Sequence, residues 1–161
     1  MVNAADCRTL VADLAERKAL AVAPQVGGSV VIGCDSMLEF DGESWGKPAD
    51  VQVGLARWRR MRGRQGSLMT GHFVVDGATG AAAGDVAVTT VRFGSPTDAE
   101  LDAYMATGEP LHVAGGFTLD GRSSPFINGI DGDPSNVIGL SLPLLRALLN
   151  RLDLSLTDFW A

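Results

Sequence analysis

The first hydrophobic pattern along the chain has the spacing of a helix. Apolar side chains recur every three or four residues from Cys7 to Val22, which predicts an amphipathic helix with one buried face. Asn3 can cap the start of this helix, and Pro24 ends it because proline cannot continue the hydrogen-bonding pattern. We therefore expect a helix that runs to about Ala23.

A strand and a short return strand are predicted next. Residues 30–40 begin with a continuous apolar run, and Asp41-Gly42 is typical of a hairpin turn. The chain then returns through Trp45. Gly46-Lys47-Pro48 forms a second turn, which is expected to bring a lysine back toward Asp35 of the first strand.

A second helix is expected from Asp50, which can cap it, to about Met61, because the apolar residues between them again have helical spacing. The end of this segment carries the only basic run of the sequence. Such a run is most often a solvated surface, but it can also bind phosphate, and both interpretations stay open. The run consists of Arg57, Arg59, Arg60, Arg62 and Arg64.

Two longer strands follow, and they form a hairpin. Residues 67–76 and 81–93 are joined by the glycine-rich stretch 77–80, which is a hairpin signal between alternating segments. A third helix is predicted after this hairpin. Thr97 and Glu100 have the spacing of a capping box, and Gly108 stops the helix.

Residues 109–141 are the least regular part of the sequence. They are rich in glycine, proline and aspartate, and a long loop of this kind inside a domain is usually functional. A last helix is predicted from Ser141 through Leu152, with its leucines facing inward.

This order of elements predicts an α/β fold. Because hairpins reverse the chain direction, we expect a mixed sheet rather than a purely parallel one. The chain has 161 residues, of which 46% are hydrophobic and 20% are charged. That composition is typical of a folded protein, and residues 1–161 are expected to form a single domain.

Charge and cysteine content narrow the classes of function. A net charge of −6 and a pI near 4.7 disfavour non-specific binding to nucleic acid or to an anionic membrane. No apolar stretch reaches the length of a membrane span, and the N-terminus lacks the pattern of a signal peptide. Cys7 and Cys34 share no metal-ligand spacing with His72 or His112, which favours reduced thiols in a cytoplasmic protein.

Few motifs with a defined chemistry are present. The sequence has no phosphate-binding loop of the G-x-x-x-x-G-K type, no dinucleotide-binding glycine motif and no H-E-x-x-H zinc motif. What remains is a set of acids with a lysine, chiefly Asp35 and Lys47. A carboxylate can hold Mg²⁺ or accept a proton from water, and a lysine can hold phosphate. The alternatives are a turn or cap aspartate and a lysine in an exposed turn.

Six segments in order resemble motifs of the Maf family of nucleoside triphosphate pyrophosphatases. Each is short, but together they span almost the whole chain. They are Leu14–Ala19, Ile32–Ser36, Gly46–Pro48, Thr70–His72, Tyr104–Phe117 and Ile130–Leu140.

This resemblance implies a fold, an activity and a set of site residues. The fold would be a long twisted mixed sheet with flanking helices and a two-lobed cleft. The activity would be hydrolysis of a nucleoside triphosphate to the monophosphate and pyrophosphate with a divalent metal, Mg²⁺ or Mn²⁺. Asp35 would activate water and bind the metal, Lys18 and Lys47 would hold phosphates, and Ser36 and Asp120 would contact the substrate. A homodimer is compatible with the resemblance.

Two departures from the family pattern affect these expectations. Members that prefer dTTP and UTP carry a glutamine where this chain has Asp120, and an ionised aspartate only accepts hydrogen bonds, so the base stays unassigned. The family also begins with a strand and an S-x-S-x-R-R phosphate loop, and residues 1–28 match neither. We therefore expect an N-terminally shortened Maf-like domain, whose alternative function would be non-catalytic nucleotide binding or a role in septum formation.

Overall fold

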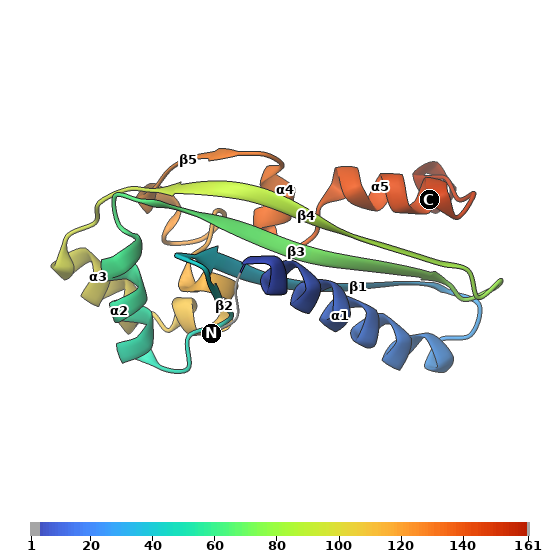
Figure 1. The fold of residues 1–161 in the computed structure, drawn as a ribbon, viewed down its shortest axis with the longest axis horizontal. Helices are drawn as coiled ribbons and strands as arrows, with labels where there is room; N and C mark the ends of the chain where they lie inside the picture. Colours follow the sequence, from blue (N-terminus) through green and yellow to red (C-terminus); the bar gives the residue numbers. More distant parts are fainter. Residues whose placement is uncertain (1–3, 161) are drawn as a thin grey trace.

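The computed structural model describes residues 4–160, which fold around a five-stranded sheet (Figure 1). The spatial order of the strands is β2-β1-β3-β4-β5, and every pairing is antiparallel. The strands are β1 (Val30–Phe40), β2 (Glu43–Trp45), β3 (Gln65–Asp76), β4 (Ala82–Phe93) and β5 (Ile127–Asp131).

The α/β class and the two hairpins are confirmed, but the sheet among the described residues is antiparallel rather than mixed. Neighbouring strands run in opposite directions, because β1 and β2 are joined by a tight turn, β3 runs back along β1, and β4 folds back on β3. In this register Ser36 of β1 lies opposite Thr70 of β3, and Asp35 lies opposite Gly71.

Helix α1 (Ala4–Val22) lies directly on one face of β1 and β3. Two strand glycines make this close approach possible. A methyl group at Gly33 would stand 2.2 Å from the carbonyl oxygen of Ala15, and one at Gly71 would stand 2.1 Å from that of Val11. Any side chain at either position would therefore push the helix away from the sheet.

The buried side of α1 differs in part from the expected one. Cys7, Val11, Ala15 and Ala19 are fully buried, whereas Val22, which was expected to face the core, is exposed. Small side chains recur at every fourth position on this side, which suits a helix that approaches a backbone closely. The expected cap, Asn3, lies outside the described residues. Beyond Val22 the chain forms a single 3₁₀ turn, Ala23–Gln25.

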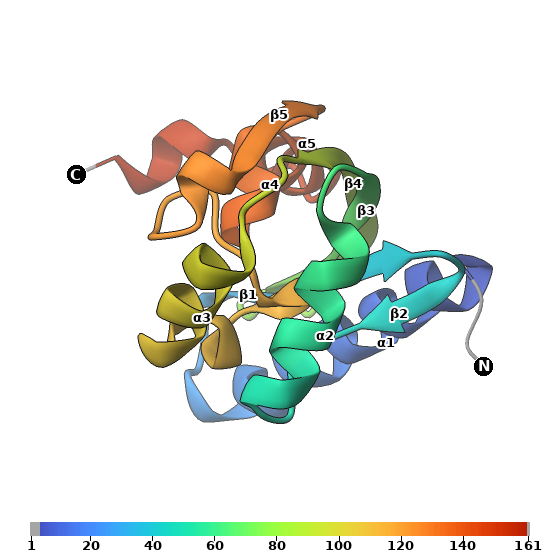
Figure 2. The same cartoon turned by 90° about the vertical axis from the view of Figure 1, so that its left-hand side faces the viewer.

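Helices α2 (Val51–Met61) and α3 (Asp98–Ala106) lie side by side at one end of the long strands (Figures 1 and 2). Both predicted caps are present. The Asp50 carboxylate accepts from the Val53 backbone N–H at 2.8 Å, and Thr97 with Glu100 forms a capping box. Trp58 of α2 anchors an aromatic core here, with edge-to-face contacts to Phe93, Tyr104 and Phe126.

The C-terminal third covers the other face of the sheet. Val74 packs against Leu145 and Leu148 of helix α5 (Leu142–Arg151), whereas its neighbour Val75 packs against Ala19 of α1. Because successive strand residues point to opposite faces, α1 and α5 lie on opposite sides of the sheet. The α5 prediction is confirmed, with Ser141 as its cap.

The region that was expected to be irregular contains short elements that the sequence pattern did not reveal. They are the 3₁₀ turns Glu109–His112, Ala114–Gly116 and Ser124–Phe126, the strand β5 and the helix α4 (Pro134–Ile138). None of the helices in residues 4–160 combines the length and apolar character that crossing a membrane would require.

Candidate active site

All five residues that the sequence singled out line one cavity of about 590 Å³. Several separate segments contribute to it: α1, β1, the turn after β2, and the residues after α3. The sequence contains two lysines, and both lie here. The five residues are Lys18, Asp35, Ser36, Lys47 and Asp120.

Lys18 and Asp35 form an ion pair across the interface between α1 and β1. The Lys18 ammonium also donates to the carbonyl oxygen of Cys34 at 3.2 Å. The Asp35 side chain is only 16% exposed, whereas that of Lys18 is 56% exposed. Gly33 explains the geometry, because it lets the backbone of α1 come close enough for Lys18 to reach the strand. Lys18 is therefore more than a solvated surface lysine.

The hydroxyl of Ser36 is fixed by a buried polar network. It shares a hydrogen bond of 2.8 Å with Thr70, which is fully buried. Thr70 also donates to the backbone carbonyl of Asn136 in α4, at 3.4 Å. The Asn136 amide in turn donates to the carbonyl of Leu68 and to the hydroxyl of Thr89. The network thus joins Ser36 to α4, whose last residues line the cavity.

The Lys47 ammonium has no hydrogen bond or ion pair with the described residues, although its backbone is held on both sides. The preceding Trp45 is buried and stacks on Phe40, and the following Pro48 is also buried. The side chain of Lys47 is exposed and borders the cavity. It is therefore available to bind an anion.

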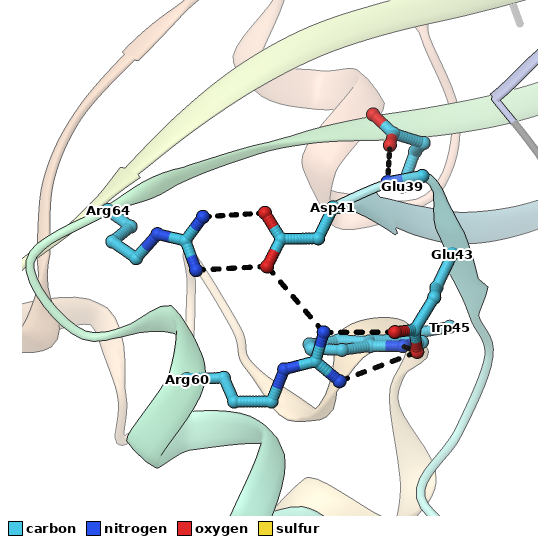
Figure 3. Close-up of polar contacts among 7 residues, drawn as sticks. Glu39, Asp41, Glu43, Trp45, Arg60 and Arg64 are labelled. Carbon is cyan, nitrogen blue, oxygen red and sulfur yellow. Dashed lines mark hydrogen bonds and ion pairs between the residues drawn. The ribbon is translucent and has the colours of Figure 1, made fainter.

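None of the five arginines of the basic run is among the residues that line the described cavity. Arg60 of α2 and Arg64, which lies between α2 and β3, bind the β1–β2 hairpin instead (Figure 3). Arg64 binds Asp41 through two hydrogen bonds, and Arg60 binds Glu43 while lying 4.8 Å from the ring centre of Trp45. Hydrogen bonds from these arginines lower the pKa of Asp41 and of Glu43. The run therefore lies outside the cavity, and Arg60 and Arg64 bind acidic residues of the hairpin. This agrees with a solvated surface rather than with a phosphate site.

Asp120 lies in a loop that Glu109 organises. The Glu109 carboxylate accepts from the hydroxyls of Tyr104 and Thr118, at 3.1 and 2.8 Å, and from the Arg122 backbone N–H at 3.0 Å. Burial alone would raise the pKa of Glu109, but these hydrogen bonds lower it overall. The loop is therefore held by an ionised side chain. The Asp120 side chain itself is exposed, with no partner among the described residues.

The cysteines and histidines do not form a catalytic pair. Both cysteines are free, and burial raises the pKa of the Cys34 thiol to about 11. His72 is buried: its Nδ1 contacts the Thr70 carbonyl, and its Nε2 accepts from the Ser141 backbone N–H. His112 is exposed at the cavity. One histidine is thus satisfied by hydrogen bonds and the other is exposed.

Comparison with known proteins identifies the family. A family profile described as Maf-like protein matches residues 2–152. The chain belongs to the Maf family.

Several relatives of this Maf protein carry the name nucleoside triphosphate pyrophosphatase. The one from Streptomyces coelicolor is 62% identical over 150 residues, which make up 92% of this chain and 73% of the relative. The one from Streptomyces avermitilis is 60% identical over 149 residues, or 91% of this chain and 72% of the relative. A relative from Salinispora tropica is 52% identical over 157 residues, which make up 94% of this chain and 70% of the relative.

The Maf cavity offers few ready-made ligands for a metal ion. Within residues 4–160, no three His, Cys, Asp or Glu side chains are grouped so that they could hold one. Mg²⁺, however, usually keeps several waters and binds through one or two carboxylates together with substrate phosphates. Asp35 supplies such a carboxylate beside the two lysines. The residues therefore fit a cation that is shared with a bound phosphate chain.

Sequence reasoning overlooked the residues that support this Maf site. Thr70 lies in a segment that resembles a family motif, and so does Glu109, but neither was given a role. Their roles depend on hydrogen bonds to residues far away in the sequence, Thr70 to Ser36 and Glu109 to the Asp120 loop. The sequence offers no clear signal for Thr70, because its strand also contains the polar residues Ser67 and His72.

Proposed function

We propose that this chain is a nucleoside triphosphate pyrophosphatase, which cleaves the α–β phosphoanhydride and releases pyrophosphate and a nucleoside monophosphate. The observation that carries the proposal is that both lysines line the same cavity as Asp35, with which Lys18 is ion-paired. An anionic chain of phosphates is the ligand that two ammonium groups suit best in an otherwise acidic protein. The names of the relatives support the same reaction.

Asp35 is proposed as the general base. Its carboxylate is partly buried, borders the cavity and is held in place by its ion pair with Lys18. In this role it accepts the proton of the attacking water while the new bond to phosphorus forms. A divalent cation, Mg²⁺ or Mn²⁺, is proposed to bind Asp35 together with the phosphates, and when bound it would neutralise phosphate charge.

The two lysines are proposed to divide the phosphate contacts. An ammonium group has three donors, and Lys18 uses two of them for Asp35 and the Cys34 carbonyl. Its third donor remains for a phosphate oxygen. Lys47, whose ammonium has no partner in the described part of the chain, can direct all three donors to the phosphates. Both charges then hold the anionic phosphate chain in the cavity.

Ser36 and Asp120 are proposed as further substrate contacts. The Ser36 hydroxyl is held in one orientation by Thr70. Because Thr70 gives its own proton to the Asn136 carbonyl, Ser36 donates to Thr70 and its free lone pair accepts from the substrate. Asp120 accepts hydrogen bonds and therefore suits the N–H groups of a base or the hydroxyls of a ribose. The identity of the base stays open. A homodimer and a cytoplasmic location, which the two free thiols favour, also stay predictions.

The test is release of pyrophosphate from a panel of nucleoside triphosphates with Mg²⁺ or Mn²⁺. Asp35→Asn keeps the shape of the side chain but removes the base, and it should lower kcat at least about 100-fold. Asp102→Asn is the matched control, because Asp102 is exposed on α3 and does not line the cavity. It should leave the rate unchanged.

Two results would count against the proposal. If Asp35→Asn releases pyrophosphate as fast as the wild type, Asp35 is not the base. If the wild type releases none from any nucleotide, the enzymatic function itself is wrong, and binding without turnover would then favour the non-catalytic alternative.

A further inference from the structure

The peptide group between Gly46 and Lys47 is held from two sides. The Arg57 guanidinium on α2 donates to the Gly46 carbonyl oxygen at 2.8 Å. The backbone N–H of Gly115 donates to the same oxygen at 3.2 Å. A carbonyl oxygen accepts two hydrogen bonds, so both of its positions are filled. This carbonyl belongs to the peptide plane that carries the Lys47 nitrogen, and its orientation sets where the Lys47 side chain begins.

Arg57 differs from the other arginines of the basic run. Arg59, Arg60, Arg62 and Arg64 are each ion-paired with an aspartate or a glutamate. Arg57 has no ion pair with any residue from 4 to 160 and gives its hydrogen bond to a backbone carbonyl. It is half-buried, and its guanidinium lies 5.2 Å from the ring centre of Trp45, the residue before Gly46.

Partial burial of the Arg57 guanidinium without an ion pair among the described residues has a cost in free energy. Removing a guanidinium from water without a carboxylate partner costs free energy, and burial lowers the pKa of Arg57 accordingly. The stacking on Trp45 and the bond to Gly46 offset part of that cost. Both contacts fall on the two residues that precede Lys47, one of the two cations at the cavity.

We propose that Arg57 is a positioning residue that directs the Lys47 ammonium into the cavity by fixing the Gly46–Lys47 peptide. Arg57 does not line the cavity itself, so it acts through Lys47 rather than on the ligand. Pro48 completes the support, because a residue before proline is confined to extended backbone conformations. The inference rests on the proposed phosphate-binding role of Lys47.

The kinetic test compares Arg57→Met with Arg59→Met. Methionine keeps much of the apolar contact with Trp45 but donates no hydrogen bond. Arg57→Met should raise KM for the nucleotide about 3- to 10-fold, the effect of one hydrogen bond, with kcat nearly unchanged. Arg59→Met removes the same charge from the same helix, where the arginine pairs with Asp98, and should leave KM unchanged. A variant that merely destabilised the fold would instead lower the apparent kcat by reducing the active fraction.

A double-mutant cycle decides whether Arg57 acts through Lys47. In a Lys47→Ala background, Arg57→Met should have little further effect on KM, because the side chain that it positions is gone. Fully additive effects of the two substitutions would overturn the proposal, since they would mean that Arg57 acts independently of Lys47.

A measurement without catalysis separates this inference from the proposed function. Protein labelled with ¹⁵N-lysine gives two backbone amide signals, because the chain contains only Lys18 and Lys47. In Arg57→Met the order parameter of the Lys47 amide should fall, while that of Lys18 in α1 stays unchanged and serves as an internal control. If Lys47 stays as rigid as in Arg59→Met, the positioning role is wrong. If it loosens but no nucleotide is hydrolysed by the wild type, the proposed function fails and the positioning role stands.

Discussion

At the scale of single residues, the site depends on polar side chains that are satisfied inside the protein. Ser36 bonds Thr70, and His72 bonds the backbone of both Thr70 and Ser141. The resemblance of Ile32–Ser36 to a Maf motif identified Ser36. It could not identify Thr70 as the support, because that pairing is created by the register between β1 and β3.

The buried histidine should make stability depend on pH. Burial lowers the pKa of His72 from its ordinary value of 6.5, because the protein interior disfavours the charged imidazolium. The hydrogen bond to the Thr70 carbonyl and the negative charges of Asp133 and Asp85 oppose this shift only in part. Below pH 6.5 the unfolded chain therefore binds more protons than the native one. The contribution of neutral His72 to stability is complete above that pH and is lost as the pH falls toward the pKa of His72 in the native state.

Urea unfolding between pH 7.5 and 5 measures this effect, in a range above the titration of ordinary carboxylates (~4). The free energy of unfolding of the wild type should fall as the pH is lowered. His72→Asn should be less stable at every pH but should show a shallower decline. An equal decline in both proteins would assign the pH dependence to other groups.

At the scale of elements, local signals predicted most of the secondary structure. The strand from Val30 to Phe40 ends where it was expected to end, because an apolar run meets a strong Asp-Gly turn. The same rules failed at β5 and α4, which are five residues each, too short to show a period. The direction of strand pairing was also predicted incorrectly, since it depends on how α2 returns the chain to the sheet.

The packing of α1 on the sheet should be sensitive to a single methyl group. Gly71→Ala places a Cβ against the backbone of Val11, which cannot move without displacing the helix, and should cost about 2 kcal/mol or more. Gly27→Ala meets no atom within 4 Å and should change stability by less than about 0.5 kcal/mol. Chemical denaturation of the two variants measures both values. Equal stabilities would show that α1 does not depend on this close contact.

At the scale of the whole molecule, charge is distributed unevenly. The chain carries a net charge of −6, and many of its arginines form ion pairs with aspartate or glutamate. Its two lysines both line one cavity. Lys18 pairs with Asp35 there, and Lys47 has no partner among the described residues. An acidic protein thereby presents two ammonium groups in one place. Composition alone could not reveal this, because the sum of charges hides their placement.

We propose that this cavity cleaves a nucleoside triphosphate between its α and β phosphates. Phosphorus NMR of the reaction mixture tests it most directly, because it identifies the bond that breaks. We predict that the triphosphate signals give way to those of a nucleoside monophosphate and pyrophosphate in equal amounts, and that Asp35→Asn abolishes the change. Formation of a nucleoside diphosphate and inorganic phosphate would contradict the claim.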